Sequence, residues 1–226
     1  MVENSKAVAL ERLPIDQRIY LEDYSPLAIL KTYYRHRELG WEEYGYVDSG
    51  KPNAVIIQPT KDENQAFSHP TTIGFVKKLK EHYDLVLRVA HSETDAYRSI
   101  SAVPSPELVI ISGHGLPGML SFSASKKEVK KAREESILDT KDDEFAHYIN
   151  HAAEDATIFL YACHGKKLTD FVKKHSGNRR VIGSKTSFAT EDLEILSYYP
   201  LDIRIITHTK IPFINREFSR DRTYIL

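Results

Sequence analysis

Short apolar runs alternate with amphipathic stretches along most of this chain, and this alternation limits the folds open to it. From residue 54 onward the runs are a few residues long and rich in Val and Ile, which is typical of buried strands. The stretches between them space apolar residues three and four apart, as helices packed on a sheet do. Repeated strand–helix units predict an α/β fold with a mostly parallel sheet and helices on both faces. We expect six strands, at residues 54–58, 85–89, 108–111, 156–162, 180–183 and 203–206.

The helices expected between these strands are residues 72–81, 93–100, 126–135, 145–153 and 167–175. Residues 1–50 differ from the rest, because they are rich in tyrosine and charge. Ser25-Pro26 predicts the start of a helix there, and residues 48–53 predict a turn or linker. We therefore expect an N-terminal helical appendage at 1–50 and one main domain at 51–226.

Composition excludes several classes of function. The 226 residues carry a net charge of -1, which gives no general case for binding nucleic acid or an anionic membrane surface. No apolar run approaches the roughly 18 residues that a membrane span needs. A single cysteine excludes an intramolecular disulfide, and the N-terminus lacks the apolar core of a signal peptide. We expect a protein without a membrane span, either cytoplasmic or exported without a cleaved signal peptide.

Two of the expected strands end in reactive side chains. The run at 108–111 is followed by Ser112-Gly113-His114-Gly115, and the run at 156–162 ends at Cys163. In a parallel sheet, ligands bind just outside the carboxyl ends of the strands. An imidazole and a thiol placed there side by side make a base and its nucleophile. The N–H groups of Gly115 and Cys163 are candidates for stabilising an oxyanion.

The segments Ile111-Ser112-Gly113-His114-Gly115 and Tyr161-Ala162-Cys163-His164-Gly165 resemble the two signature blocks of caspase-like (clan CD) cysteine peptidases, closest to bacterial members. The resemblance covers about residues 54–207. It implies a three-layer caspase-like fold with strand order 2-1-3-4-5-6, and a cysteine endopeptidase that works through a thioester acyl-enzyme, with self-processing as one route of activation. His114 would be the base and Cys163 the nucleophile, acting on a protein or peptide substrate with no cofactor or metal. The caspase block around the cysteine is not matched, so specificity for aspartate is not implied.

The resemblance also assigns the substrate cleft to the segment after the fifth strand. This segment is Ser184, Lys185, Thr186, Ser187 and Phe188. If Lys185 points into the cleft, it favours an acidic or polar residue before the cleaved bond. If Lys185 faces solvent, Phe188 favours a Leu-like residue, and the rarity of buried lysines favours this alternative.

Other interpretations stay open at this point. The chain could be a catalytically inactive caspase-like binding domain, or a thiol acyltransferase or deamidase. His164 is a second histidine beside the cysteine, expected on the opposite side of the chain. His147 and His151 lie four residues apart, as surface histidines or as two metal ligands. The long stretch 116–141 is expected to be mobile in part or to shield the site. The resemblance also implies that an acidic small-molecule activator is conceivable, as in some members of the clan, but we favour a solvated surface for the basic residues near the site. These are Lys166, Lys167, Lys173, Lys174, Arg179 and Arg180.

Overall fold

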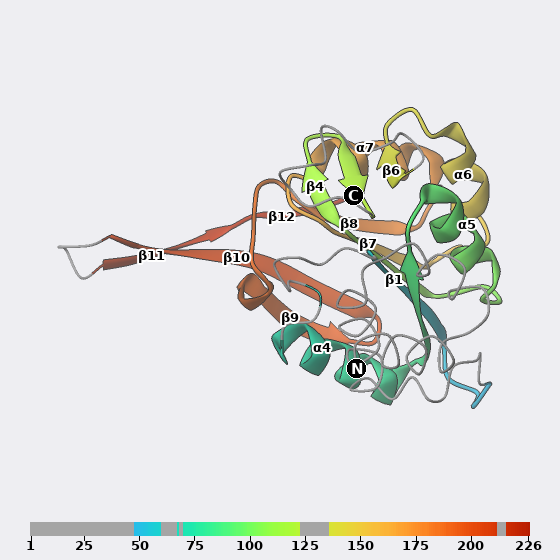
Figure 1. Cartoon of the computed structure of the whole chain (residues 1–226). Coiled ribbons are helices and arrows are strands. Elements are labelled where there is room, and N and C mark those ends of the chain that lie inside the picture. Colours follow the sequence, from blue (N-terminus) through green and yellow to red (C-terminus); the bar gives the residue numbers. More distant parts are fainter. Residues whose placement is uncertain (1–47, 60–66, 68–69, 123–135, 212–215) are drawn as a thin grey trace, which may run out of the picture.

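The computed structural model describes residues 48–59, 67, 70–122, 136–211 and 216–226 (Figure 1). A six-stranded sheet of order β12-β8-β7-β3-β1-β2 lies at its centre. The first five strands in chain order pair in parallel, and β12 runs antiparallel to β8. The strands are β1 (Asn53–Pro59), β2 (Asp84–Ala90), β3 (Leu108–Ser112), β7 (Thr157–Tyr161), β8 (Arg180–Ser184) and β12 (Thr223–Ile225).

In the described residues, four α-helices connect the strands. They are α4 (Pro70–His82), α5 (Glu93–Ser101), α6 (Asp143–Ile149) and α7 (Lys166–His175). They confirm four of the expected helices, with α6 ending earlier than predicted. The helix expected at 126–135 lies outside the described residues. So do residues 1–47, and with them almost all of the expected N-terminal appendage.

Alternate side chains of the central strands enter two different apolar clusters. Ile57, Ile111 and Leu160 pack with side chains of α5, α6 and α7. Ile56 and Ile110 point the other way, and their cluster includes α4 and β10 (Leu201–Ile211). Because both faces are buried, the strands read as nearly continuous apolar runs, as parallel strands do. Each fully buried aliphatic side chain contributes about 1.5–3 kcal/mol to this core.

The predicted position of the sixth strand is wrong. Residues 203–206 do not extend the main sheet but lie in β10, the middle strand of an antiparallel sheet with β9 (Leu193–Tyr198) and β11 (Arg216–Asp221). Ile203 and Ile205 are fully buried against the main domain, whereas Arg204 between them is exposed. This alternation is typical of a strand with one face exposed to solvent. The sixth position belongs instead to β12, and β10 and β11 reach away from the body as a long hairpin (Figure 1).

A small antiparallel sheet that we did not predict follows β3, in a stretch for which we expected a loop and the helix at 126–135. It consists of β4 (His114–Leu116), β5 (Met119–Ser121) and β6 (Ile137–Asp139). Gly118 makes the turn between β4 and β5 with φ of 87°, a conformation that favours glycine. Leu120 and Leu138 are fully buried. Residues 123–135 lie outside the described part, so the shielding expected of this stretch stays a prediction.

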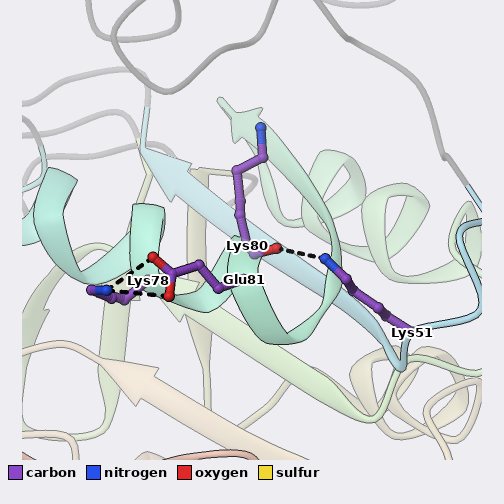
Figure 2. A network of polar contacts seen from close by, with 4 residues as sticks. All are labelled: Lys51, Lys78, Lys80 and Glu81. Atoms are coloured by element: carbon purple, nitrogen blue, oxygen red, sulfur yellow. Dashed lines mark hydrogen bonds and ion pairs between the residues drawn. The ribbon is translucent and has the colours of Figure 1, made fainter.

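The start of β1 is tied to the end of α4 by polar contacts. The Lys51 ammonium donates to the Lys80 carbonyl at 3.2 Å, in the last turn of the helix (Figure 2). Such carbonyls have no partner within their own helix, so a cation there is favourable. Lys78 and Glu81 form an ion pair at 2.9 Å on the same helix. Both side chains of that pair are exposed, so it adds only a few tenths of a kcal/mol.

Candidate active site

The two strands that carry the predicted catalytic residues are neighbours. β3 pairs in parallel with β7, in a register that runs from Leu108 opposite Thr157 to Ser112 opposite Tyr161. One step further, the Gly113 N–H donates to the Tyr161 carbonyl at 3.3 Å. The chain segments that lead to His114 and to Cys163 therefore leave the sheet at the same edge. This confirms the predicted adjacency of the two strands.

Gly115 lies directly against the backbone of Cys163. A Cβ at position 115 would stand 2.0 Å from the Cys163 carbonyl oxygen and 2.9 Å from the Cys163 nitrogen. No side chain fits in that space, because the obstacle is backbone. Glycine is therefore required at 115 for the two segments to approach this closely.

His114 begins β4 and is buried, with its ring packed edge-on against Phe67 at 5.7 Å between ring centroids. Phe67 also contacts the Tyr161 ring at 5.6 Å. Apolar packing of this kind orients an imidazole and shields one side of it from water. Sequence reasoning missed Phe67, a lone aromatic residue after β1 with no pattern around it.

Cys163 lies in the tight turn between β7 and α7 and is half-buried. Its thiol donates to the Phe188 carbonyl at 3.7 Å. His164 takes a left-handed conformation with φ of 55°, and its N–H donates to the Thr186 carbonyl at 3.0 Å. The His164 Nε2 atom shares a hydrogen bond of 2.8 Å with the Ser187 hydroxyl. Cys163 and His164 thus both contact the segment that follows β8.

The predicted substrate segment, residues 184–188, is brought to the cysteine by these contacts. Buried Ser184 donates its hydroxyl to the Thr186 carbonyl at 2.7 Å, and the Lys185 N–H donates to the Arg222 carbonyl at 2.9 Å. The Lys185 side chain is exposed, which agrees with the solvent-facing alternative. The Phe188 ring is half-buried and lies 5.5 Å from the Tyr161 ring.

The charge of Lys185 is partly matched by an acid from a distant part of the chain. Burial works against ionisation of Asp221, but hydrogen bonds from Thr223 and the positive charges of Lys185 and Arg204 outweigh it, so its pKa is lowered. The positive charge of Lys185 thus acts on a carboxylate of this protein. Asp221 is 36 residues away from Lys185 in sequence, and nothing in the sequence pointed to it.

Two further polar side chains reach the same edge of the sheet, and the sequence analysis did not single out either. Gln58 ends up level with Ser112, because Ile57 pairs with Ile111 in the preceding position of β1 and β3. Both residues are only 1% exposed. Within the described part of the chain, the Gln58 Oε1 atom and the Ser112 hydroxyl have no hydrogen-bond partner. A polar residue at the end of an apolar run was the signal available in the sequence.

The remaining candidates are the histidine pair and the basic residues. His147 and His151 contact each other ring to ring at 5.8 Å, and the described residues contain no group of three side chains suited to a metal ion. Several of the basic residues already have partners within the chain. Contacts of this kind join Lys166 to Asp170, Lys173 to the Gly177 and Arg179 carbonyls, Arg179 to Asn150, and Arg180 to Asp202.

No helix in the described ranges is long and apolar enough to cross a membrane. No protein-family model, curated protein or solved structure matches this chain.

Proposed function

We propose that this protein is a cysteine endopeptidase in which Cys163 is the nucleophile and His114 is the general base. The observation that carries the proposal is the close approach of the two strand ends. Ser112 stands opposite Tyr161, and Gly115 packs on the Cys163 backbone with no room for a side chain. This approach brings the segment that carries His114 against the turn that carries Cys163, as a base and its nucleophile require.

The proposed reaction runs in two halves. His114 takes the proton of the Cys163 thiol, and the sulfur attacks the carbonyl carbon of the scissile bond. The tetrahedral intermediate breaks its C–N bond, and the protonated His114 gives its proton to the departing amine. Water, deprotonated by His114, then attacks the thioester, which releases the carboxylate product and restores the thiol.

The developing oxyanion needs donors that are already in place. The backbone N–H groups of Gly115 and Cys163 are the proposed donors, since Gly115 lies against Cys163 and carries no side chain in the way. Removal of one such donor typically costs 100- to 1,000-fold in rate.

Residues 184–188 are the proposed edge along which the substrate lies. Lys185 is exposed, whereas the Phe188 ring packs toward Tyr161 beside the cysteine. This arrangement favours an apolar, Leu-like residue before the cleaved bond over an acidic one. Strong preference for Arg or Lys there would contradict the assignment, because no acidic residue occurs from Val181 to Thr190.

A three-layer caspase-like arrangement, related to bacterial members of that clan, is part of the same proposal. Five parallel strands in the order β2-β1-β3-β7-β8 support it, as does the order of histidine before cysteine along the chain. The antiparallel β12 in the sixth position departs from the expected sheet. Self-processing remains part of the proposal and is read out by intact mass of the purified chain, since self-cleavage lowers it.

The dyad is tested with an active-site thiol probe on wild type, Cys163→Ala and His114→Ala, with the exposed His151→Ala as the matched control. We expect Cys163→Ala to abolish labelling, His114→Ala to slow it by at least about 100-fold, and His151→Ala to leave it unchanged. Labelling at the wild-type rate in His114→Ala would contradict the dyad.

Cleavage of a peptide library then separates the alternatives. A peptidase cleaves a subset of peptides with a defined residue before the cut. A reactive thiol with no cleavage, but with transfer of acyl groups to amines or release of ammonia from glutamine, would indicate an acyltransferase or deamidase. An unreactive thiol would indicate a binding domain.

A further inference from the structure

Three consecutive contacts join the turn after β7 to the segment after β8. The Cys163 thiol donates to the Phe188 carbonyl at 3.7 Å, and the His164 N–H donates to the Thr186 carbonyl at 3.0 Å. The His164 ring and the Ser187 hydroxyl complete the set at 2.8 Å. Two of the three contacts come from His164. His164 therefore contacts this segment through both its side chain and its backbone.

The backbone of His164 is held in a conformation that few residues adopt. Its φ of 55° lies in the left-handed region, where histidine is found more often than most side chains but still at a cost. Such a conformation persists only when surrounding contacts hold it. Here the contacts that hold it are those to Thr186 and Ser187.

The other side of the same segment is fixed independently. Ser184 bonds to the Thr186 carbonyl, and the Lys185 N–H bonds to the Arg222 carbonyl. These contacts fix the segment to β8 and to the chain before β12, but they do not set its distance from the cysteine. The contacts of His164, the next residue to the nucleophile, set this distance together with the contact of the Cys163 thiol to Phe188.

We propose that His164 is a positioning residue, which holds residues 186–188 at a fixed distance from the Cys163 sulfur so that a peptide laid along them meets the nucleophile. This inference rests on the proposed function. It gives His164 a role distinct from that of His114, because His164 neither takes the thiol proton nor touches the reacting atoms. Its effect is on the binding of an extended peptide, not on the reactivity of the thiol.

Two labelling reagents separate these effects. Iodoacetamide is small and reads the reactivity of the Cys163 thiol alone. A tetrapeptide acyloxymethyl ketone with Leu next to the reactive group also needs the peptide-binding segment to be in place. The ratio of the two rate constants reports positioning, and a general loss of structure would lower both.

The variants are His164→Gly, Ser187→Ala and their double mutant. Glycine keeps the left-handed backbone and the N–H to Thr186 and removes only the imidazole. Ser219→Ala is the matched control, because Ser219 and His208 share a similar hydrogen bond of 3.0 Å on the β10–β11 hairpin.

We expect each single variant to slow peptidyl labelling by about three- to tenfold, as the loss of one hydrogen bond does. The double mutant should be no slower than the slower single variant, because both changes remove the same bond. The rate with iodoacetamide should change by less than about twofold, and Ser219→Ala should match wild type.

Unchanged peptidyl labelling in both single variants, with labelling still lost in His114→Ala, would overturn the positioning role and leave the proposed function standing. Equal slowing of both reagents in variants with wild-type circular dichroism and urea unfolding would also overturn it, since the imidazole would then act on the thiol itself. The proposed function and the inference would be overturned together if wild type reacts with the peptidyl ketone no faster than with iodoacetamide and His114→Ala reacts at the same rates as wild type.

Discussion

Substitution of Gly115 by alanine is the sharpest test of the close approach between the two strand ends. The new Cβ would stand 2.0 Å from the Cys163 carbonyl oxygen, whereas ordinary contact begins near 3.4 Å. The backbone must therefore separate by about 1.4 Å. Neither obstacle can rotate away, because the Cys163 oxygen, carbon and nitrogen all belong to the main chain.

Displacement of this size acts on stability and on reactivity. Overpacking in a well-packed region costs about 1–3 kcal/mol of unfolding free energy. A misplacement of about 1 Å in an active site costs on the order of 100-fold in rate. We expect Gly115→Ala to fold with a lower midpoint in urea and to label with the thiol probe about 100 times more slowly.

The matched control is Gly74→Ala in α4. Gly74 is exposed, and a Cβ there meets no atom within 4 Å. Because glycine destabilises a helix interior, this change should raise the unfolding free energy by about 0.5–1 kcal/mol and leave labelling unchanged. Far-UV circular dichroism and urea unfolding report folding, and intact mass reports labelling. A folded Gly115→Ala protein that labels within twofold of wild type would refute the reasoning.

Three further predictions concern stability. Burial and nearby Asp142 raise the pKa of Glu93 from its ordinary 4.5 to about 7, so the contribution of this group to stability is full below pH 4.5 and is lost as pH rises through about 7. Glu93→Gln should therefore raise the melting temperature more at pH 8 than at pH 5, and an equal rise at both pH values would contradict this. The guanidinium of buried Arg179 donates to the Asn150 side chain and to nearby carbonyls, an arrangement of donors that a lysine cannot reproduce. Arg179→Lys should lower the unfolding free energy measured in urea by about 2–3 kcal/mol. A change below about 0.5 kcal/mol would count against this. Ser112→Ala should be neutral or stabilising by up to about 1 kcal/mol, because it removes a buried hydroxyl without a partner among the described residues, and clear destabilisation would show that the hydroxyl is satisfied.

The main sheet was predictable because its strands are buried on both faces. Residues 54–58, 108–111 and 156–162 are apolar nearly throughout, and the structure has them as β1, β3 and β7 in the expected order. The outermost strand, β12, was not predictable from such runs. β12 has only three residues, and its pairing with β8 gives it no long apolar run to recognise.

Residues 203–206 were predicted in the wrong sheet, although the sequence contains a signal against that prediction. Arg204 interrupts Ile203 and Ile205, and such alternation indicates a strand with one exposed face, not a strand buried on both faces. Ile203 and Ile205 pack in the cluster that contains Ile56 and Ile110, so they are buried against one face of the main sheet without joining it.

The candidate site was predictable in its two strand ends and not in its surroundings. His114 and Cys163 follow apolar runs, and parallel pairing brings their segments to one edge. The ring contact between Phe67 and His114 and the electrostatic interaction of Asp221 with Lys185 depend on the folding of loops and hairpins far away in sequence. No local pattern records such contacts, because they arise only when distant segments pack together.

The most direct measurement of the central claim is a crystal structure of the chain labelled at Cys163 with the tetrapeptide ketone. We expect a covalent bond to the Cys163 sulfur, with the ketone-derived oxygen within about 3.2 Å of the Gly115 and Cys163 nitrogens. We also expect the His114 ring on the side of the leaving group and the peptide along residues 184–188. An adduct whose oxygen points away from both N–H groups, or whose peptide lies elsewhere, would contradict the account.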